Sequence, residues 1–156
     1  MVSLINTKSI YTQLKDKVVL EFAQINTNDK LQYKPCLAIV VITKKPVDDK
    51  DPEDASTIAC VNIKAKMCAE VGLNVLNFNF IHSEYDKIFE LINKLNDDPE
   101  ISGIMIHHTK KNIVLDSIYN MLNPEKDVNG VALCNQGLVM TSIDTAILHP
   151  AILAGI

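Results

Sequence analysis

The sequence predicts an α/β domain of three layers, in which a mainly parallel sheet is flanked by helices on both faces. The continuous apolar run at residues 36–43 has the composition of a strand that is buried on both faces, and the run at residues 73–80 indicates a second strand. Segments with helical periodicity alternate with these runs through short connections, which is typical of parallel strands joined by crossover helices. Sites in such sheets form beyond the carboxyl ends of the strands, so we expect the site after Thr43, Phe80 and Ile106.

The first helix and strand are predicted from apolar spacing and from the loop between them. Residues 7–25 indicate an amphipathic helix with Thr7 as its N-terminal cap. The polar residues 26–35 indicate a loop that leads into the first strand, at 36–43. The apolar face of the helix carries, at steps of four residues, Ile10, Leu14, Val18 and Phe22.

A second helix is expected after the charged, proline-containing loop 44–54. Its candidate caps are Asp54 and Ser56, and Gly72 is its expected C′ residue. The second strand, at 73–80, follows directly.

The second half of the chain continues the alternation. Ser83, with Asp86 three residues later, indicates the capped start of a third helix, which ends at residues 97–99. The expected buried face of this helix carries Ile88, Phe89, Ile92 and Leu95. The remaining expected elements are a short third strand at 104–106, a helix at 115–122 and a candidate fourth strand within 131–140.

Composition and charge restrict the class of partner. The chain is 47% hydrophobic and 22% charged, as expected for a single globular domain, and its net charge of −4 offers no basic surface for nucleic acid. The longest apolar run, residues 36–42, is too short to span a bilayer, and the N-terminus lacks the apolar region of a signal peptide. We therefore expect a cytoplasmic protein, with an organellar one as the alternative, and no nucleic-acid or membrane partner.

The four cysteines form no Cys-x-x-Cys pair and lie within apolar or helical runs. Such cysteines usually act as small buried hydrophobic residues in a reducing compartment. A metal site or a disulfide framework is the alternative, and we expect no metal. The four residues are Cys36, Cys60, Cys68 and Cys134.

Lys64 lies on the apolar face of the second helix with Val61 and Cys68, whereas Lys66 points to the opposite side. In one interpretation, Lys64 lays its methylene groups on apolar surface and keeps its ammonium in water. In the other, it lies in a partly dry cleft, where desolvation disfavours the charged form of a lysine and permits proton exchange. Helical periodicity is compatible with both interpretations.

The residues around Lys64 resemble the signature helix, SxxYVxxK, of bifunctional methylenetetrahydrofolate dehydrogenase/cyclohydrolases. Lys64 falls on the catalytic lysine of that family and Thr57 on its serine. PEKDVNG, at residues 124–130, closely resembles the family motif PEKDVDG. Further matches occur in the family's order at residues 34–38, residues 91–104, Asn135, Gly137, Pro150 and residues 155–156.

The resemblance implies a tetrahydrofolate derivative as ligand, bound in a cleft between two domains. In the family, a hydride passes from the methylene bridge to NAD(P) bound by a second, Rossmann domain, and water then opens the methenyl ring. The family's catalytic positions correspond to Lys64 and His107, where the family has a lysine and a glutamine. Its substrate-binding positions correspond to Thr57, Cys60, Asp127, Asn129 and Pro150.

Several family residues are replaced in this chain. Cys60 stands in place of a tyrosine, His107 in place of the glutamine and Asn129 in place of the second aspartate of DVDG. Three roles are open for His107. It carries a proton beside Lys64, or it is a cation that disfavours the charge of the lysine, or it forms a pair with His108 that has no role in the chemistry. No Gly-x-Gly turn is present, so we expect residues 1–156 to form one folate-binding-type domain without the cofactor domain and to bind no cofactor alone.

Two functions remain open at this point. The first is the catalytic, tetrahydrofolate-binding domain of a dehydrogenase/cyclohydrolase, impaired or inactive as a dehydrogenase on its own. The second is a non-catalytic folate-binding or subunit-interaction module of the same fold, whose protein partner is a second copy of the chain or a paralogous subunit. Outside the family, a generic α/β ligand-binding or redox domain is the alternative.

Overall fold

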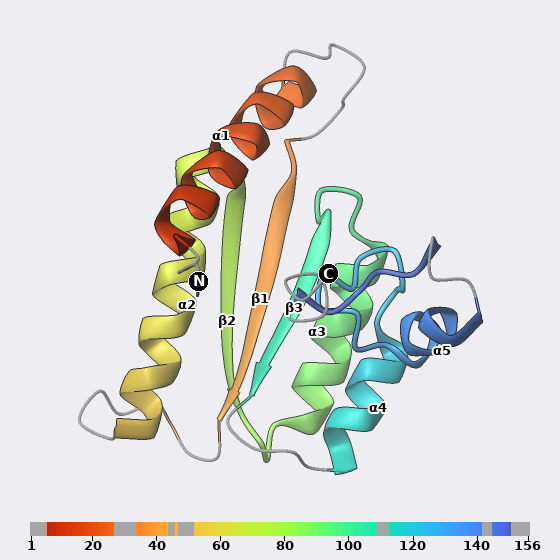
Figure 1. Cartoon of the computed structure of the whole chain (residues 1–156). Helices are drawn as coiled ribbons and strands as arrows, with labels where there is room; N and C mark the ends of the chain where they lie inside the picture. The colour runs from red at the N-terminus through yellow and green to blue at the C-terminus, as the bar shows by residue number, and fades with distance from the viewer. Residues whose placement is uncertain are drawn as a thin grey trace, which may run out of the picture.

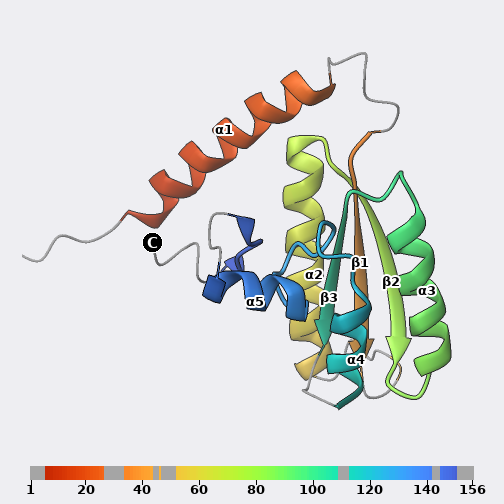
Figure 2. The ribbon, with the colours of Figure 1, turned by 90° about the vertical axis from the view of Figure 1, so that its right-hand side faces the viewer.

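The computed structural model describes residues 6–26, 34–43, 46, 52–108, 113–141 and 145–150, and it has three layers (Figure 1). Three parallel strands in the order β2-β1-β3 form the middle layer. Helix α2 covers one face of the sheet, and α3 and α4 cover the other (Figure 2). The expected α/β class is confirmed. In chain order the elements are α1 (Thr7–Asn26), β1 (Cys36–Thr43), α2 (Pro52–Val71), β2 (Asn74–Ile81), α3 (Tyr85–Asp97), β3 (Gly103–His108), α4 (Ile113–Met121) and α5 (Leu133–Thr141).

The central strand β1 is buried on both faces, as its apolar composition predicts. Ala38, Val40 and Ile42 face α3 and α4, whereas Ile39 and Val41 pack under α2. Because β1 pairs with both neighbours, its register fixes the position of the other two strands. The core positions predicted on α3 are confirmed for the buried residues Ile88, Ile92 and Leu95.

Helix α2 ends at Val71, and Gly72 is its C′ residue, as predicted. Gly72 has a φ of 84°, its N–H donates to the Ala69 carbonyl, and the N–H of Leu73 donates to the Cys68 carbonyl. This pair of hydrogen bonds is the Schellman arrangement, which glycine favours because it has no Cβ. The predicted caps at the other end are wrong, since α2 begins at Pro52 and both Asp54 and Ser56 lie inside it. Proline is favoured at a first helical position, where its missing N–H removes no hydrogen bond.

Helix α3 is preceded by Glu84, and the predicted cap at Ser83 is wrong. Glu84 uses its Oε2 atom to accept a hydrogen bond of 3.0 Å from the N–H of Ile81, and its Oε1 atom accepts one from Lys87. The carboxylate therefore fixes the turn between β2 and α3. Sequence spacing favours Ser83, but it does not show which side chain faces the last N–H group of the strand.

Helix α1 lies against α2, away from the sheet (Figure 2). Its cap is Asn6, whose side-chain oxygen accepts a hydrogen bond from the N–H of Ser9, and not Thr7 as predicted. An ion pair between Lys15 and Glu70 joins α1 to α2. The predicted apolar face is largely exposed, with Leu14 at 59%, because α1 packs against another helix and adds nothing to the central core. Among the described residues, no helix has the length and apolar content needed to cross a membrane.

Residues 131–140 do not form a strand, and the expectation of a fourth strand here is wrong. The chain turns at Gly130, which has a φ of 63°, and α5 begins at Leu133. Its only buried residue is Asn135, which points inward to a buried carboxylate. Leu133 and Met140 of this helix are exposed.

The cysteines are free thiols with different surroundings. Cys36 is buried, as predicted, and desolvation raises the pKa of its thiol; burial likewise raises the pKa of the half-buried Cys68 thiol. Cys134 is exposed, which contradicts the prediction, because the segment that carries it is the surface helix α5.

Candidate functional site

The PEKDVNG segment lies along the outer edge of β3. Asp127 forms an isolated parallel bridge with Ile104. The N–H of Ile104 donates to the carbonyl of Lys126 at 2.6 Å, and the N–H of Val128 donates to the carbonyl of Ile104 at 3.4 Å. The segment is thus held as a short extension of the sheet, which brings Asn129 next to the end of β3.

Lys126 fixes the segment to the end of α3. Its Nζ donates three hydrogen bonds of 2.7–2.9 Å to backbone carbonyls in the last turn of α3 and just after it. A helix ends with carbonyls that lack intrahelical partners and carry partial negative charge, so a lysine is well placed there. The acceptors are the carbonyl oxygens of Leu95, Asn96 and Asp98.

Asp127 is fully buried, and its two carboxylate oxygens accept internal hydrogen bonds. Oδ2 accepts from the N–H of Ala132 at 2.8 Å and from the side-chain amide of Asn135 at 3.0 Å. Oδ1 accepts from the N–H of Asn129 at 3.2 Å. The carboxylate therefore shapes the turn that carries Asn129 and is not exposed to a ligand.

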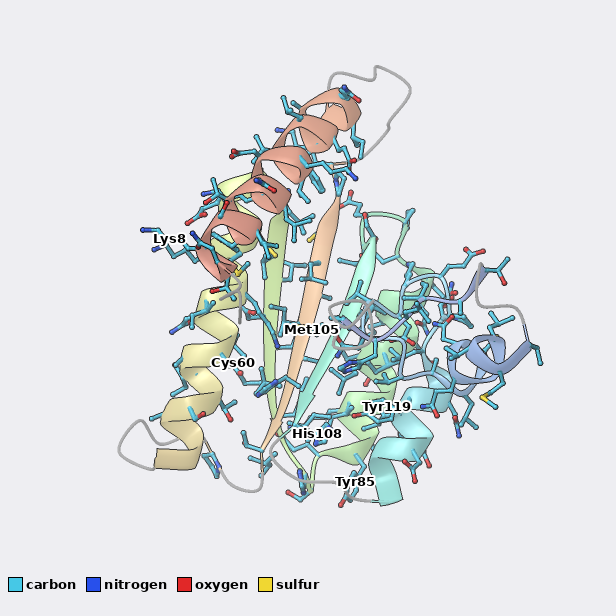
Figure 3. The ribbon with its side chains drawn as sticks, viewed as in Figure 1. Lys8, Cys60, Tyr85, Met105, His108 and Tyr119 are labelled. Carbon is cyan, nitrogen blue, oxygen red and sulfur yellow. The ribbon has the colours of Figure 1, made fainter. Side chains whose placement is uncertain are left out.

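An open groove of about 590 Å³ lies between α2, β3 and the turn after Asp127, and it is called the Lys64 groove below. Figure 3 shows Met105 along β3, with His108 and Tyr119 near the end of that strand. Its apolar lining includes Met67, Met105 and Val131. Its polar and ionisable lining residues include Lys64, His107, His108, Tyr119, Asn129 and His149.

Lys64 and His107 reach this groove from different elements. Lys64 lies on α2 and is partly buried; His107 lies on β3, in register with Val41 of β1. Burial, the charge of Lys64 and then His108 lower the pKa of the His107 imidazole, so the ring is neutral at pH 7. In the described part of the chain, neither side chain takes part in a hydrogen bond or salt bridge.

Two aromatic rings and one amide border the same groove. The rings of His108 and Tyr119 lie 6.2 Å apart between centroids. Burial, with the charges of Asp116 and Asp127, raises the pKa of the Tyr119 phenol to about 12, so the hydroxyl keeps its proton. The Asn129 amide donates through Nδ2 to the Ile106 carbonyl at 3.3 Å, and this contact fixes the orientation of its oxygen.

The structure brings together four of the seven residues selected from the sequence. Lys64, His107, Asn129 and Pro150 line the Lys64 groove. Thr57 lies elsewhere, in a separate cavity of about 520 Å³ between α2 and β2.

The other two selected residues do not line the groove. Cys60 is half-buried on α2, one turn before Lys64, but it does not reach the lining. Asp127 lies beneath the groove, inside the turn that it stabilises. The residues that meet in space therefore come from three places: α2 on its β3 side, the end of β3, and the turns beside β3.

Three further ionisable residues of the groove, His108, Tyr119 and His149, were not assigned a role from the sequence. Tyr119 follows the buried Ile118 on α4, and its side chain packs against the same core. His149 precedes Pro150, so its proximity follows from the placement of that proline. No local pattern distinguishes either residue from a core side chain.

The fold and groove define a class: an α/β domain whose ionisable side chains gather in a groove at the edge of a parallel sheet. The profile of the tetrahydrofolate dehydrogenase/cyclohydrolase catalytic domain matches residues 5–129. The chain belongs to this family, as the resemblance of its motifs predicts.

Curated relatives agree with this assignment. The bifunctional protein FolD of Caldanaerobacter subterraneus is 32% identical over 135 residues, which are 86% of this chain and 43% of the relative. FolD of Acetivibrio thermocellus is 28% identical over 139 residues, covering 88% of this chain and 45% of the relative. The chain thus spans less than half the length of these curated relatives.

Solved structures share the fold. FolD from Campylobacter jejuni superimposes with a TM-score of 0.73 at 23% identity, over 94% of this chain and 49% of that one. FolD from Trypanosoma brucei, described as complexed with NADP cofactor and inhibitor, superimposes with a TM-score of 0.72 at 14% identity, over 90% of this chain and 44% of that one.

The residues of this chain do not fit a nicotinamide cofactor. A dinucleotide pyrophosphate requires closely spaced glycines at the start of a helix, where the backbone approaches the phosphates. The five glycines of the sequence are scattered. Within the part of the chain that the structure describes, the two with positive φ are Gly72, which follows the last residue of a helix, and Gly130, which lies in a turn.

Proposed function

We propose that the Lys64 groove binds a tetrahydrofolate derivative and that the activity it supports best is hydrolysis of the methenyl form. The observation that carries this proposal is the meeting of Lys64 and His107 in one groove beside Asn129. Membership of the dehydrogenase/cyclohydrolase catalytic-domain family supports the choice of ligand.

The hydrolysis needs a base and a donor near the bridging carbon. The oxygen of water bonds to this carbon, which belongs to the cationic methenyl group, and the water gives up one proton to the base. The hydroxyl of the adduct then loses its own proton as the carbonyl of the formyl group forms and the bond from the carbon to one ring nitrogen breaks. That nitrogen takes up one proton, so one proton is released overall. The neutral ring of His107 accepts the proton from water. The Lys64 ammonium donates a hydrogen bond to the oxygen as it becomes negative.

The pterin end of the ligand is assigned to Asn129. With Nδ2 held by the Ile106 carbonyl, the side chain presents Oδ1 to an amine of the ring. A neutral amide binds an amine less strongly than a carboxylate does, by about 1.5–3 kcal/mol for one charge-assisted contact. Pro150 borders the ligand, and Asp127 is a positioning residue that holds the turn of Asn129. We assign no ligand contact to Thr57 or Cys60.

We also propose that residues 1–156 by themselves do not oxidise methylenetetrahydrofolate. This rests on the glycine pattern, which offers no pyrophosphate site. The test is to add methylenetetrahydrofolate with NAD or with NADP and to follow absorbance at the wavelength of the reduced cofactor. Steady reduction of either cofactor would overturn this part of the proposal.

The test of hydrolysis is an assay with methenyltetrahydrofolate, in which Lys64→Met is compared with Lys66→Met. Lys66 is exposed on the opposite side of α2, so its replacement controls for the loss of one surface charge. We expect turnover in the unmodified chain and in Lys66→Met, and background rates in Lys64→Met. Turnover that survives Lys64→Met contradicts the proposed site.

A non-catalytic folate-binding module is the second candidate, and the replacements at Cys60 and Asn129 favour it. Cys60 has no aromatic ring to stack on a ligand, and Asn129 has no charge. Calorimetric binding of a folate together with background hydrolysis by the unmodified chain would select this candidate. Absence of both binding and turnover would leave a role in subunit interaction.

A further inference from the structure

We propose that the Lys64 groove binds an oxyanion, a carboxylate or a phosphate, between Lys64 and His107, and that His107 takes up a proton from solvent when the oxyanion binds. The proposal concerns this anionic group alone, so it stands or falls independently of whether the ligand is a folate. It specifies which charge the groove selects.

The first argument is the sign of the charge in the groove. Among the described residues that line it, no aspartate or glutamate is present. Helix α2 contributes Lys64, β3 contributes His107 and His108, α4 contributes the protonated phenol of Tyr119, and the segment before Pro150 contributes His149. The nearby carboxylate of Asp127 is fully buried and occupied by Asn129, Ala132 and Asn135.

The second argument is unused hydrogen-bonding capacity at the two residues that meet in the groove. An ammonium has three donors and a protonated imidazole has two. For both Lys64 and His107, the described part of the chain supplies no hydrogen-bond or salt-bridge partner, although both side chains are partly buried. An oxyanion supplies several acceptors and the opposite charge, and donors from a cation to an oxyanion form the stronger class of hydrogen bond.

The proton coupling follows from the charges around His107. Burial and the positive charge of Lys64 keep the imidazole neutral at pH 7. An oxyanion between the two residues offsets the charge of Lys64 and favours the imidazolium. Asn129, His108, Tyr119 and His149 add no negative charge that would already favour it. Anion binding and protonation of His107 are therefore expected to strengthen each other, as linkage requires.

The experiment is an NMR titration of the histidine ring resonances in the 156-residue chain, between pH 5 and 8, with His107→Gln used to assign the His107 signal. Inorganic phosphate and acetate are the probes, and sodium chloride of equal ionic strength is the reference. We expect at least one probe to raise the titration midpoint of His107 by about half a pH unit or more. A response to phosphate alone or to acetate alone shows which oxyanion the groove prefers.

Two variants locate the effect. Lys64→Met is expected to abolish the shift of the His107 midpoint, whereas Lys66→Met, which removes an exposed lysine from the same helix, leaves it unchanged. Asn129→Asp places a carboxylate in the groove, and the repulsion between this carboxylate and the probe is expected to weaken the binding of the probe by about tenfold. The probe concentration that gives half of the midpoint shift should rise by that factor.

The proposal is overturned if neither probe moves the midpoint relative to chloride, or if Lys64→Met responds as the unmodified chain does. The hydrolysis assay is a separate measurement, so a failure here leaves the proposed function intact. Loss of hydrolysis likewise leaves the anion response to be judged by the titration.

Discussion

The buried carboxylate of Asp127 accepts a hydrogen bond of 3.0 Å from the side-chain amide of Asn135, which is buried as well. Two further N–H groups, those of Asn129 and Ala132, donate to the same carboxylate. One acidic group therefore joins the turn of the Lys64 groove to the first turn of α5.

This arrangement predicts that Asp127→Asn destabilises the fold. The substitution keeps the volume but replaces one accepting oxygen by an NH₂ group that faces other donors, so we expect a loss of about 3 kcal/mol in the free energy of unfolding. Denaturation in urea, monitored by circular dichroism, measures it. Asp16→Asn, on the exposed surface of α1, is the matched control and should change little. Equal stability of the two variants would contradict the role given to Asp127.

The hydrogen bonds of Lys126, the residue before Asp127, predict that its replacement also destabilises the fold. In Lys126→Met the three carbonyls at the end of α3 lose their charged donor, and we expect the free energy of unfolding to fall by about 2 kcal/mol. The control is Lys94→Met, because the Lys94–Glu90 ion pair on α3 is exposed to water and contributes little. If Lys94→Met costs as much as Lys126→Met in a urea titration, the three contacts do not stabilise the fold.

Two glycines of the same region should respond to alanine in opposite directions. At Gly130, φ is 63° and an added Cβ would overlap the carbonyl oxygen of Ile147, so Gly130→Ala should lower the free energy of unfolding by more than about 2 kcal/mol. At Gly137, inside α5, an added Cβ meets nothing within 4 Å, and Gly137→Ala should stabilise by about 0.5–1 kcal/mol. Thermal unfolding of both variants checks the signs, and a shift in the same direction would refute the account.

The lowered pKa of His107 predicts how the free energy of unfolding depends on pH. In the unfolded chain an imidazole titrates near 6.5, whereas burial and Lys64 lower the pKa of His107 in the folded chain. Below about pH 6.5 the unfolded chain therefore binds the proton more readily, so the free energy of unfolding decreases as pH falls through 6.5 toward the lower, folded pKa. Unfolding in urea at pH 7.5 and 5.5 should show a smaller decrease for His107→Gln than for the unmodified chain. Identical decreases would show that His107 is not the residue responsible.

Much of the secondary structure follows from the sequence alone. The strand at 36–43 is recognisable because eight successive residues are apolar or β-branched, and such a run is buried on both faces wherever it packs. Helix α3 is recognisable because Ile88, Ile92 and Leu95 repeat at helical spacing. Gly72 marks the end of α2, since few other residues adopt its backbone conformation. These are local properties, and the order of motifs such as PEKDVNG also identifies the family without coordinates.

The tertiary structure decided which of these residues meet. Lys64 and Thr57 lie on one helix, seven residues apart, yet they face different cavities, because the position of α2 across the sheet determines which strand each side chain reaches. His107 reaches Lys64 through the pairing of β3 with β1. Asp127 turns inward because Ala132 and Asn135 place donors around it. Such contacts between distant segments depend on packing and register, which a local pattern of residues does not encode.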